Sequence, residues 1–209
     1  MPEEVQVSAG RTRNRWGEGD RLRGEILHAA SRLLSELGGE DGLTIRGVAR
    51  AVGIAPASIY QHFTDRAALV KGLLDYEFAR LRAEMEAAEA CEDPADPVGR
   101  VRALIHAYCH FAMENPGHYR LMMANGSSRP TPEAHPQGPL PDLIDLLREG
   151  FARCAAAGIA LRVPSERAGV IAFVGAHGRV ALFHTSPARG GGAGSVVPFV
   201  DELVALVFA

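Results

Sequence analysis

Side chains that can donate hydrogen bonds gather between residues 58 and 62 of this 209-residue chain. Ser58, Tyr60, Gln61 and His62 can each donate to a phosphate oxygen or to the edge of a base. Gln61 is the best candidate for reading a base, because its amide can form two hydrogen bonds to adenine at once. The residue types and their spacing therefore predict a nucleic-acid-binding surface.

These side chains need a rigid support, and the flanking sequence predicts two short helices joined by a tight turn. Thr44 suits the N-cap of the first helix, and Gly53 suits its C-terminal end. The second helix is expected over residues 56–63, with Ile59 and Phe63 on its buried side. A helix-turn-helix of this kind places its second helix in the major groove of DNA.

Three further residues complete the predicted surface. Arg46, in the first turn of the first helix, can reach the DNA backbone or a base. Ala57 lies in the first turn of the second helix, and the backbone N–H groups near Thr44 can hold a phosphate at a helix N-terminus.

The distribution of charge agrees with a basic head on an acidic body. Residues 11–71 hold ten Lys or Arg and seven Asp or Glu, a net +3. Residues 76–209 hold twelve and fifteen, a net −3, and the whole chain carries −3 at pH 7. Such a protein would touch phosphates with one end only.

Helical periodicity extends on both sides of this segment. Residues 18–37 are expected to form a helix that ends before two glycines, with an apolar stripe of Leu22, Ile26, Ala29, Leu33 and Leu37. The first 17 residues carry three arginines and are expected to form a flexible basic arm. Further helices are expected at about 64–89, 98–114, 118–123, 141–157, 164–183 and 198–208, with loops at 125–141 and 189–194. The prediction is an all-α chain with a helix-turn-helix head over residues 18–66 and a larger body over residues 67–209.

Residues 20–70 closely resemble the TetR family of repressors. The family pattern couples an apolar helix, a turn centred on glycine, a Tyr-any-His-Phe sequence and a charged opening of the fourth helix. Here those parts are Val48-Ala49, Gly53, Tyr60-Gln61-His62-Phe63 and Asp65-Arg66. The resemblance implies a dimer with two DNA-binding heads and a ligand-binding body, in which Tyr60, His62 and Arg66 contact phosphates. Ala55 departs from the Ser or Thr that often caps the recognition helix, a loss of about 1 kcal/mol of local stability.

The body resembles one TetR subgroup through Asn115-Pro116-Gly117-His118-Tyr119-Arg120-Leu121-Met122 and, much later, His177-Gly178. Members of that subgroup often carry Trp-His-Gly, and Ala176 stands here in place of the Trp. The smaller side chain would widen a cavity.

The last two predicted helices are candidates for a subunit interface. One is rich in Gly and Ala, and the other is apolar on nearly every side, which favours burial on more than one face. We expect a two-fold homodimer with a four-helix interface, whose recognition helices, about 34 Å apart, read a palindromic operator. The alternative is that both helices belong to the internal core of a monomer.

Adaptable methionine and aromatic side chains in the body suit an apolar or aromatic small-molecule effector. The candidates for its pocket are Met85, Tyr108, Phe111, Tyr119, Met122, Phe151, Phe173 and His177. Each could instead be ordinary core. Effector binding would favour a spacing of the heads that does not fit the operator. The predicted function is therefore a transcriptional repressor that a small molecule releases from its operator.

His106 and His110 raise the alternative of a metal site, because they lie four residues apart on a helix with Cys109 beside one of them. No fourth ligand is evident, and hydrogen bonding of both histidines inside a helical core or pocket is the simpler interpretation. No cofactor is expected. The sequence also lacks a Ser/His/Asp order, a nucleophile motif or paired carboxylates, so an enzyme is not expected.

We expect a cytoplasmic protein. The longest apolar run, residues 168–176, is too short to span a bilayer, and the polar N-terminus lacks the apolar core of a secretion signal. Three widely spaced cysteines do not form a disulfide framework. A further alternative is a helical small-molecule-binding protein whose head no longer recognises DNA well.

Overall fold

The computed structural model describes residues 18–125, 139–185 and 193–209. Within these ranges the protein is helical and has no β-sheet, with one isolated bridge between Leu161 and Phe208, so the predicted all-α fold is confirmed. The predicted basic arm, and most of the predicted loops at 125–141 and 189–194, lie outside the described residues.

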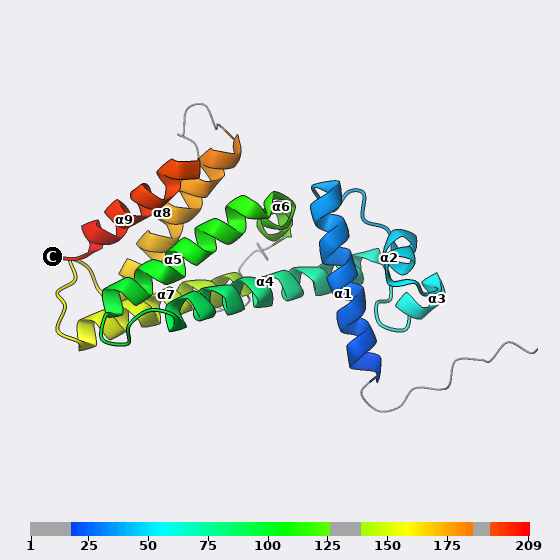
Figure 1. The fold of residues 1–209 in the computed structure, drawn as a ribbon, viewed down its shortest axis with the longest axis horizontal. Helices are drawn as coiled ribbons and strands as arrows, with labels where there is room; N and C mark the ends of the chain where they lie inside the picture. Colours follow the sequence, from blue (N-terminus) through cyan, green and yellow to red (C-terminus); the bar gives the residue numbers. More distant parts are fainter. Residues whose placement is uncertain (1–17, 126–138, 186–192) are drawn as a thin grey trace, which may run out of the picture.

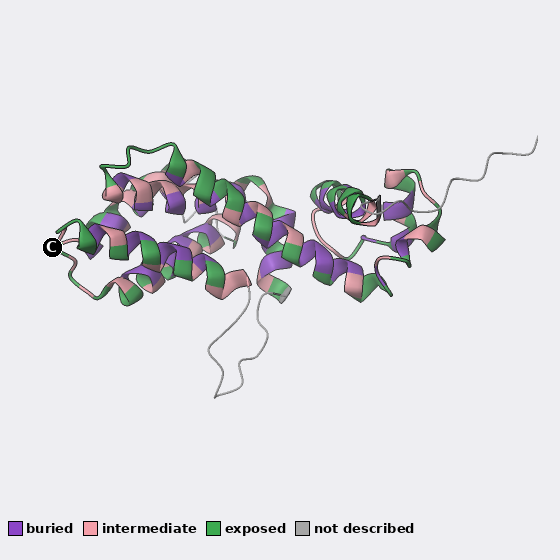
Figure 2. Ribbon diagram, turned by 90° about the horizontal axis from the view of Figure 1, so that it is seen from below, coloured by how far each residue is buried: buried purple, intermediate pink, exposed green. Residues whose placement is uncertain are grey.

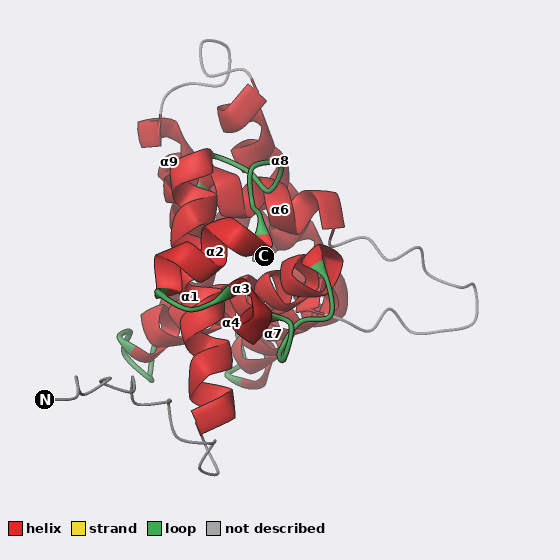
Figure 3. Ribbon diagram, turned by 90° about the vertical axis from the view of Figure 1, so that its right-hand side faces the viewer, coloured by secondary structure: helices red, strands yellow, loops and turns green. Residues whose placement is uncertain are grey.

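The helices lie in two groups joined by one long helix, α4 (Figure 1). Figure 3 looks at the molecule from the side of the smaller group, the head, which contains α1, α2, α3 and the start of α4. The rest of α4 and the later helices form the body. In chain order the helices are α1 (Glu18–Leu37), α2 (Ile45–Val52), α3 (Pro56–Ile59), α4 (Arg66–Ala90), α5 (Pro97–Glu114), α6 (Pro116–Asn125), α7 (Pro139–Ala156), α8 (Ser165–Thr185) and α9 (Val196–Val207).

The core of the head forms between α1, α2, α3 and the first turns of α4. Its buried side chains include Ile26, Leu34, Val48, Ile59 and Leu69. The predicted stripe on α1 is wrong at its end, because Leu37 is exposed. The buried side of α1 follows Ile26, Leu27, Ala30 and Leu34 instead, and α2, α4 and α6 are the helices that pack on α1.

The core of the body is centred on α5, which contacts α4, α6, α7, α8 and α9. Its inward side chains, among them Val101, Leu104 and Ile105, are fully buried. Figure 2 shows the buried faces of the body helices turned toward one another along the length of the bundle.

Candidate functional site

Helix α2 is fixed at both ends by local hydrogen bonds. The hydroxyl oxygen of Thr44 accepts a hydrogen bond from the N–H of Gly47 at 3.0 Å, so Thr44 is the N-cap of α2 as predicted. Gly53 ends α2 with φ of 76°, a left-handed conformation that glycine adopts without a steric penalty. Its backbone N–H donates to carbonyl oxygens of α2, as expected for a helix C-cap.

The recognition helix is shorter than predicted. It begins with a proline and ends at Ile59, so the prediction of a helix over residues 56–63 is wrong in its second half. The N–H groups of His62 and Phe63 both donate to the carbonyl oxygen of Ile59 at 2.9 Å, and this shared acceptor tightens the chain into a turn. Tyr60, Gln61 and His62 therefore lie on this turn directly after α3. Ala55 provides no side-chain cap at the start of α3, as the sequence indicated.

Two buried anchors hold this turn against the head. Ile59 and Phe63 are both buried, and a Cβ placed at Gly72 of α4 would lie 2.7 Å from the ring of Phe63. Glycine at this position thus lets Phe63 pack directly on α4. The guanidinium of Arg23 lies 4.6 Å from the centre of the same ring, a cation–π arrangement that adds α1 to the contact.

The side chains predicted to touch DNA are largely on the surface around this turn. Tyr60 is 55% exposed, which is unusual for a large aromatic side chain. Ser58 and His62 are partly buried, and the exposed members of the predicted set are Thr44, Arg46, Ala57, Tyr60, Gln61 and Arg66. The head thus presents hydrogen-bond donors on a tightly held turn, an arrangement suited to phosphates and base edges.

Arg66 makes contacts within the head that the sequence did not indicate. Its Nε donates to the carbonyl oxygen of Leu43 at 2.8 Å, and a terminal nitrogen donates to the carbonyl oxygen of Glu40. The side chain therefore fastens the start of α4 to the loop between α1 and α2. A guanidinium has five N–H donors, so these two hydrogen bonds leave donors for a phosphate. The phosphate contact of Arg66 remains a prediction.

Four of the predicted pocket residues meet in the body. Oη of Tyr108 lies 2.8 Å from Nδ1 of His177, and Oη of Tyr119 lies 3.5 Å from the same nitrogen. The ring of Phe173 stacks on His177 with a centroid distance of 5.8 Å and an interplanar angle of 8°. Burial lowers the pKa of His177, raises the pKa of Tyr119 to about 12 and raises the pKa of Tyr108 well above its usual value. All three side chains are therefore neutral at pH 7.

The other four predicted pocket residues are also buried. Met85, Phe111, Met122 and Phe151 are almost completely inaccessible to solvent. Phe151 packs against Phe208 at a centroid distance of 5.9 Å. That these eight residues line a ligand pocket remains a prediction.

Two family models match the chain. The model described as bacterial regulatory proteins of the tetR family matches residues 26–73, which contain the turn described above. The model described as the tetracyclin repressor-like C-terminal domain matches residues 101–207, about half of the chain. The chain belongs to the TetR family. Regulators of this family are non-enzymatic transcription factors that bind DNA and ligands and that dimerise, so the protein is a TetR-family DNA-binding transcription regulator.

Solved structures share this TetR fold over most of the chain. A protein of unknown function from Rhodococcus sp. RHA1 is 28% identical, with a TM-score of 0.73 and coverage of 90% of this chain and 96% of that one. A TetR-family transcription regulator from Marinobacter aquaeolei VT8 has a TM-score of 0.64 at 17% identity, covering 91% and 97%. SmeT, a repressor of a Stenotrophomonas maltophilia multidrug efflux pump, has a TM-score of 0.65 at 18% identity, covering 90% of each chain.

Curated relatives match a shorter part of the chain. The nucleoid occlusion factor SlmA of Vibrio campbellii is 29% identical over 100 residues, and SlmA of Aliivibrio fischeri is 32% identical over the same length. These matches cover 48% of this chain and 50% of each relative. The chain therefore spans about half the length of the curated relatives it matches.

A buried polar cluster, which we call the junction cluster, joins the head of this TetR-family protein to its body. It contains Ser31 of α1, Glu77 of α4 and His118 of α6. Nε2 of His118 lies 3.1 Å from Oγ of Ser31 and 3.5 Å from Oε1 of Glu77. Glu77 and His118 are 0% and 1% exposed. Burial raises the pKa of Glu77 and lowers the pKa of His118, which in both cases favours the neutral form.

Charged and polar groups at the edge of the junction cluster belong to α4 and to Asn115, the C-cap of α5. Arg80 lies 3.4 Å from the carboxylate of Glu77 and within 3.4 Å of the side-chain oxygen of Asn115, while Glu84 ion-pairs with Arg80 one turn further along. Sequence reasoning missed this cluster. The available signal was an acidic residue, Glu77, inside the apolar pattern of Leu73, Leu74, Phe78 and Leu81.

Helix α6 also contacts α1 through its backbone. A Cβ at Gly117 would lie 2.8 Å from the carbonyl oxygen of Leu34, so the two helices approach more closely than any larger residue allows. The guanidinium of Arg120 donates to the carbonyl oxygen of Gly38, just past the end of α1. On its other side α6 presents Tyr119 to His177, so one short helix touches both the head and the aromatic group in the body.

The two histidines considered for a metal face different partners. Nε2 of His106 lies 3.1 Å from the carboxylate of Asp201 on α9, and Arg102 contacts the same oxygen. His110 is largely exposed, with Glu114 at 3.9 Å. Within the described ranges, no three His, Cys, Asp or Glu side chains are arranged to hold a metal ion. No helix described in the structure is both long and apolar enough to cross a membrane.

Proposed function

We propose that this protein is a cytoplasmic transcriptional repressor that binds a palindromic operator as a homodimer and is released by a small-molecule effector. The observation that carries the proposal is the exposed Tyr60 on a turn that the buried Ile59 and Phe63 hold in place. The hydroxyl of an exposed tyrosine can donate to a phosphate oxygen, and operator DNA is the partner that TetR-family regulators bind.

The exposed apolar side chains support a dimer through the last two helices. Five of the seven large apolar side chains that are exposed in the described chain belong to α8 and α9. They are Ile171, Val174, Leu182, Phe199 and Leu206. On α8 the residues recur at positions 171, 174 and 182, which places them on one side of that helix. A contiguous exposed apolar surface marks an interaction site, and two-fold pairing of the same surface buries both copies at once.

The contacts of α6 support a route from effector to operator. An effector beside His177 would displace Tyr119, and α6 carries Tyr119 together with Gly117, His118 and Arg120, which touch α1 or α4. Movement of α6 would then move α1 and with it the head. In this mechanism the effector stabilises the arrangement of heads that does not fit the operator.

The test is capture of genomic DNA fragments by the purified full-length protein at low and moderate salt. We expect selective capture of a few short palindromes, with at least tenfold weaker binding by Tyr60→Ala, Gln61→Ala and Arg46→Ala. Arg82→Ala, which removes a surface cation from the body part of α4, away from α8 and α9, is the matched control and should bind normally. Binding to all fragments alike, erased by moderate salt, would contradict the proposal, because it indicates phosphate attraction without readout.

The SlmA proteins suggest a second candidate, the nucleoid occlusion after which they are named. The same capture experiment separates the two. A promoter-bound repressor selects a few sites beside regulated genes, whereas a factor acting on the whole nucleoid selects many sites distributed over the chromosome.

A further inference from the structure

The junction cluster buries two groups that can exchange a proton with each other. Oε1 of Glu77 and Nε2 of His118 are 3.5 Å apart, and the two side chains are 0% and 1% exposed. Among the described residues, neither Oε1 of Glu77 nor Nδ1 of His118 has a hydrogen-bond partner. The electrostatic balance at this contact between head and body therefore depends on how many protons the two side chains hold.

One proton beyond those of a carboxylate and a neutral imidazole leaves the pair without net charge. This shared proton can lie on Glu77, with both side chains neutral, or on His118, with the two forming an ion pair. Without it the pair carries a net negative charge, and with a second proton it carries a net positive charge. An unbalanced charge is costly to bury, because it has lost its hydration. The buried pair is therefore most stable with one shared proton.

Helices α1 and α4 compensate only partly for a change in that charge. Helix α1 presents the uncharged hydroxyl of Ser31, and Arg80 of α4 lies 3.4 Å from the carboxylate of Glu77. Arg80 pairs more closely with Glu84, at 3.0 Å, so its charge is shared between two carboxylates. Burial accordingly raises the pKa of Glu77 and Glu84 adds to the rise, although Ser31 and Arg80 favour the ionised form.

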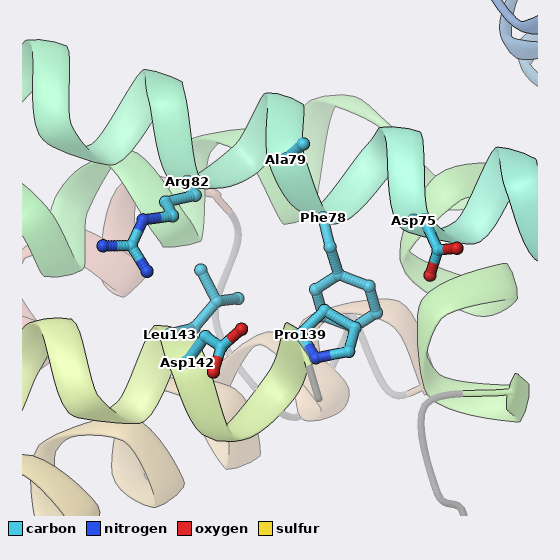
Figure 4. A pocket seen from close by; sticks show the side chains of 7 residues that line it. All are labelled: Asp75, Phe78, Ala79, Arg82, Pro139, Asp142 and Leu143. Carbon is cyan, nitrogen blue, oxygen red and sulfur yellow. The ribbon is translucent and has the colours of Figure 1, made fainter. Parts of the chain in front are cut away.

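The other charged side chains of the packed helices face away from the pair. Asp75 and Arg82 lie on the opposite side of α4, where they line a surface pocket with α7 (Figure 4). Helix α5 presents the ring of Phe111 edge-on to His118, at a centroid distance of 6.5 Å. Arg120 of α6 donates to the backbone just past the end of α1. A second proton would therefore add to the positive charge of the nearby guanidinium, which already disfavours a charged imidazole.

We propose that the junction cluster is a proton-operated latch between the head and the body. It is closed while Glu77 and His118 hold one shared proton, and it opens when the pair loses that proton or gains a second. Opening moves α6 away from Ser31 and Leu34 of α1, because the unbalanced charge must reach water. The inference concerns the contacts within one chain and does not depend on the proposed regulatory function.

The pKa values of the hydrated side chains set the pH range in which the latch is closed. Once the latch is open, the pKa is about 4.5 for Glu77 and about 6.5 for His118. Between these values the open pair holds one proton, as the closed pair does, so pH does not affect opening. Above about pH 6.5 the open pair holds none, so opening becomes up to about tenfold more favourable per pH unit. Below about pH 4.5 it holds two, and opening is favoured again.

The test is hydrogen–deuterium exchange of the full-length protein from about pH 5 to about pH 8.5, corrected for the intrinsic effect of pH on exchange. In α1 and α6 of the wild type we expect constant protection up to about pH 6.5, and a fall of up to about tenfold per pH unit above it. Helix α7 has no residue in the cluster and should stay better protected at every pH, since the latch opens without unfolding the body. Unchanged protection above pH 6.5, or equal protection of α1, α6 and α7, would overturn the proposal.

Two variants separate the members of the pair. Glu77→Gln leaves only His118 to titrate, so protection should fall below about pH 6.5 and stay constant above it. His118→Gln leaves only Glu77, so protection should fall with rising pH from about pH 5 upward. His28→Gln, an exposed substitution on α1, is the matched control and should keep the wild-type profile.

The variant profiles can also contradict the latch. A Glu77→Gln profile that still falls above pH 6.5, a His118→Gln profile identical to that of the wild type, or an altered profile in His28→Gln would overturn the proposal. The wild-type profile is decisive by itself if either variant of the pair fails to fold.

Discussion

Nε2 of His118 lies 3.1 Å from the hydroxyl of Ser31, across 87 residues of sequence, and so joins α6 of the body to α1 of the head. The carboxylate of Glu77 completes this junction cluster from α4. Three helices from two parts of the molecule thus meet at groups that can change their protonation. The contribution of the junction cluster to the stability of the protein should therefore depend on pH, and substitutions in the cluster can measure that dependence.

Glu77→Gln should stabilise the protein at neutral pH. Burial raises the pKa of Glu77, so its contribution to stability is present at low pH and is lost as the pH rises through that raised pKa. Glutamine does not ionise, and we expect a gain of about 1 kcal/mol in the free energy of unfolding at pH 8 that shrinks toward pH 5. Urea unfolding at several pH values measures it. Glu84→Gln, exposed on the same helix, should change stability by less than about 0.5 kcal/mol. A gain that is the same at every pH would contradict the assignment.

Gly117→Ala should separate α6 from α1. The new Cβ would lie 2.8 Å from the carbonyl oxygen of Leu34, so the backbone of one helix must move. We expect a loss of about 1–3 kcal/mol in the free energy of unfolding, together with weaker operator binding. Gly24→Ala is the matched control, since a Cβ there meets nothing within 4 Å and alanine favours the helix by about 0.5–1 kcal/mol. Equal thermal stabilities of the two variants would contradict the close contact.

Arg66→Ala should affect both the stability of the head and its attraction to DNA. Loss of the hydrogen bonds to Leu43 and Glu40 should lower the free energy of unfolding by about 1 kcal/mol. If Arg66 also contacts a phosphate, the slope of log affinity against log salt should fall by about 1. Arg66→Lys keeps the charge but not the planar donors, so we expect the stability loss with an unchanged slope. An unaltered salt slope in Arg66→Ala would show that Arg66 makes contacts only within the head and none with a phosphate.

Val174→Lys combined with Leu206→Lys should yield a folded monomer. These side chains are 59% and 70% exposed in the single chain, so lysine should disturb the fold little while placing like charges in the proposed interface. Sedimentation velocity measures the loss of dimer, and operator affinity should fall with it. Leu37→Lys, at a similarly exposed leucine on α1, should leave the dimer intact. A dimeric double variant would place the interface elsewhere.

His177→Gln should remove part of the acid sensitivity of the protein. Burial lowers the pKa of His177, so the stability it contributes is present above its usual pKa of about 6.5 and is lost as the pH falls through the lowered value. Between pH 7 and pH 5 the wild type should therefore lose stability relative to the variant. Thermal unfolding across this range compares them. His28→Gln, an exposed substitution on α1, should follow the wild type at every pH.

Local patterns in the sequence predicted the local structure of the head well. The predicted bounds of α1, the cap at Thr44, the end of α2 at Gly53 and the proline at the start of α3 are all confirmed, because each depends on neighbours within a few residues. The extension of the recognition helix to Phe63 was wrong. Apolar spacing at Ile59 and Phe63 fits a helix, but the same spacing is also satisfied by a tight turn that shares one carbonyl acceptor.

Long-range contacts were beyond this kind of reasoning. Periodicity identifies a buried side of a helix but does not say which helix covers it, so the meeting of Ser31, Glu77 and His118 was not predicted. The same limit applies to the candidate pocket. Residue type selected eight side chains that are now found mostly buried, yet only the structure shows that Tyr108, Tyr119, Phe173 and His177 come together.

The length of α4 has a mechanical consequence. Its 25 residues form one uninterrupted helix that begins in the head and ends deep in the body. At 1.5 Å per residue it is a rod of about 37 Å, so a tilt of about 5° at one end carries the other end about 3 Å. That displacement is as long as a hydrogen bond. A small rearrangement in the body can therefore break the contacts with bases that we propose for the head.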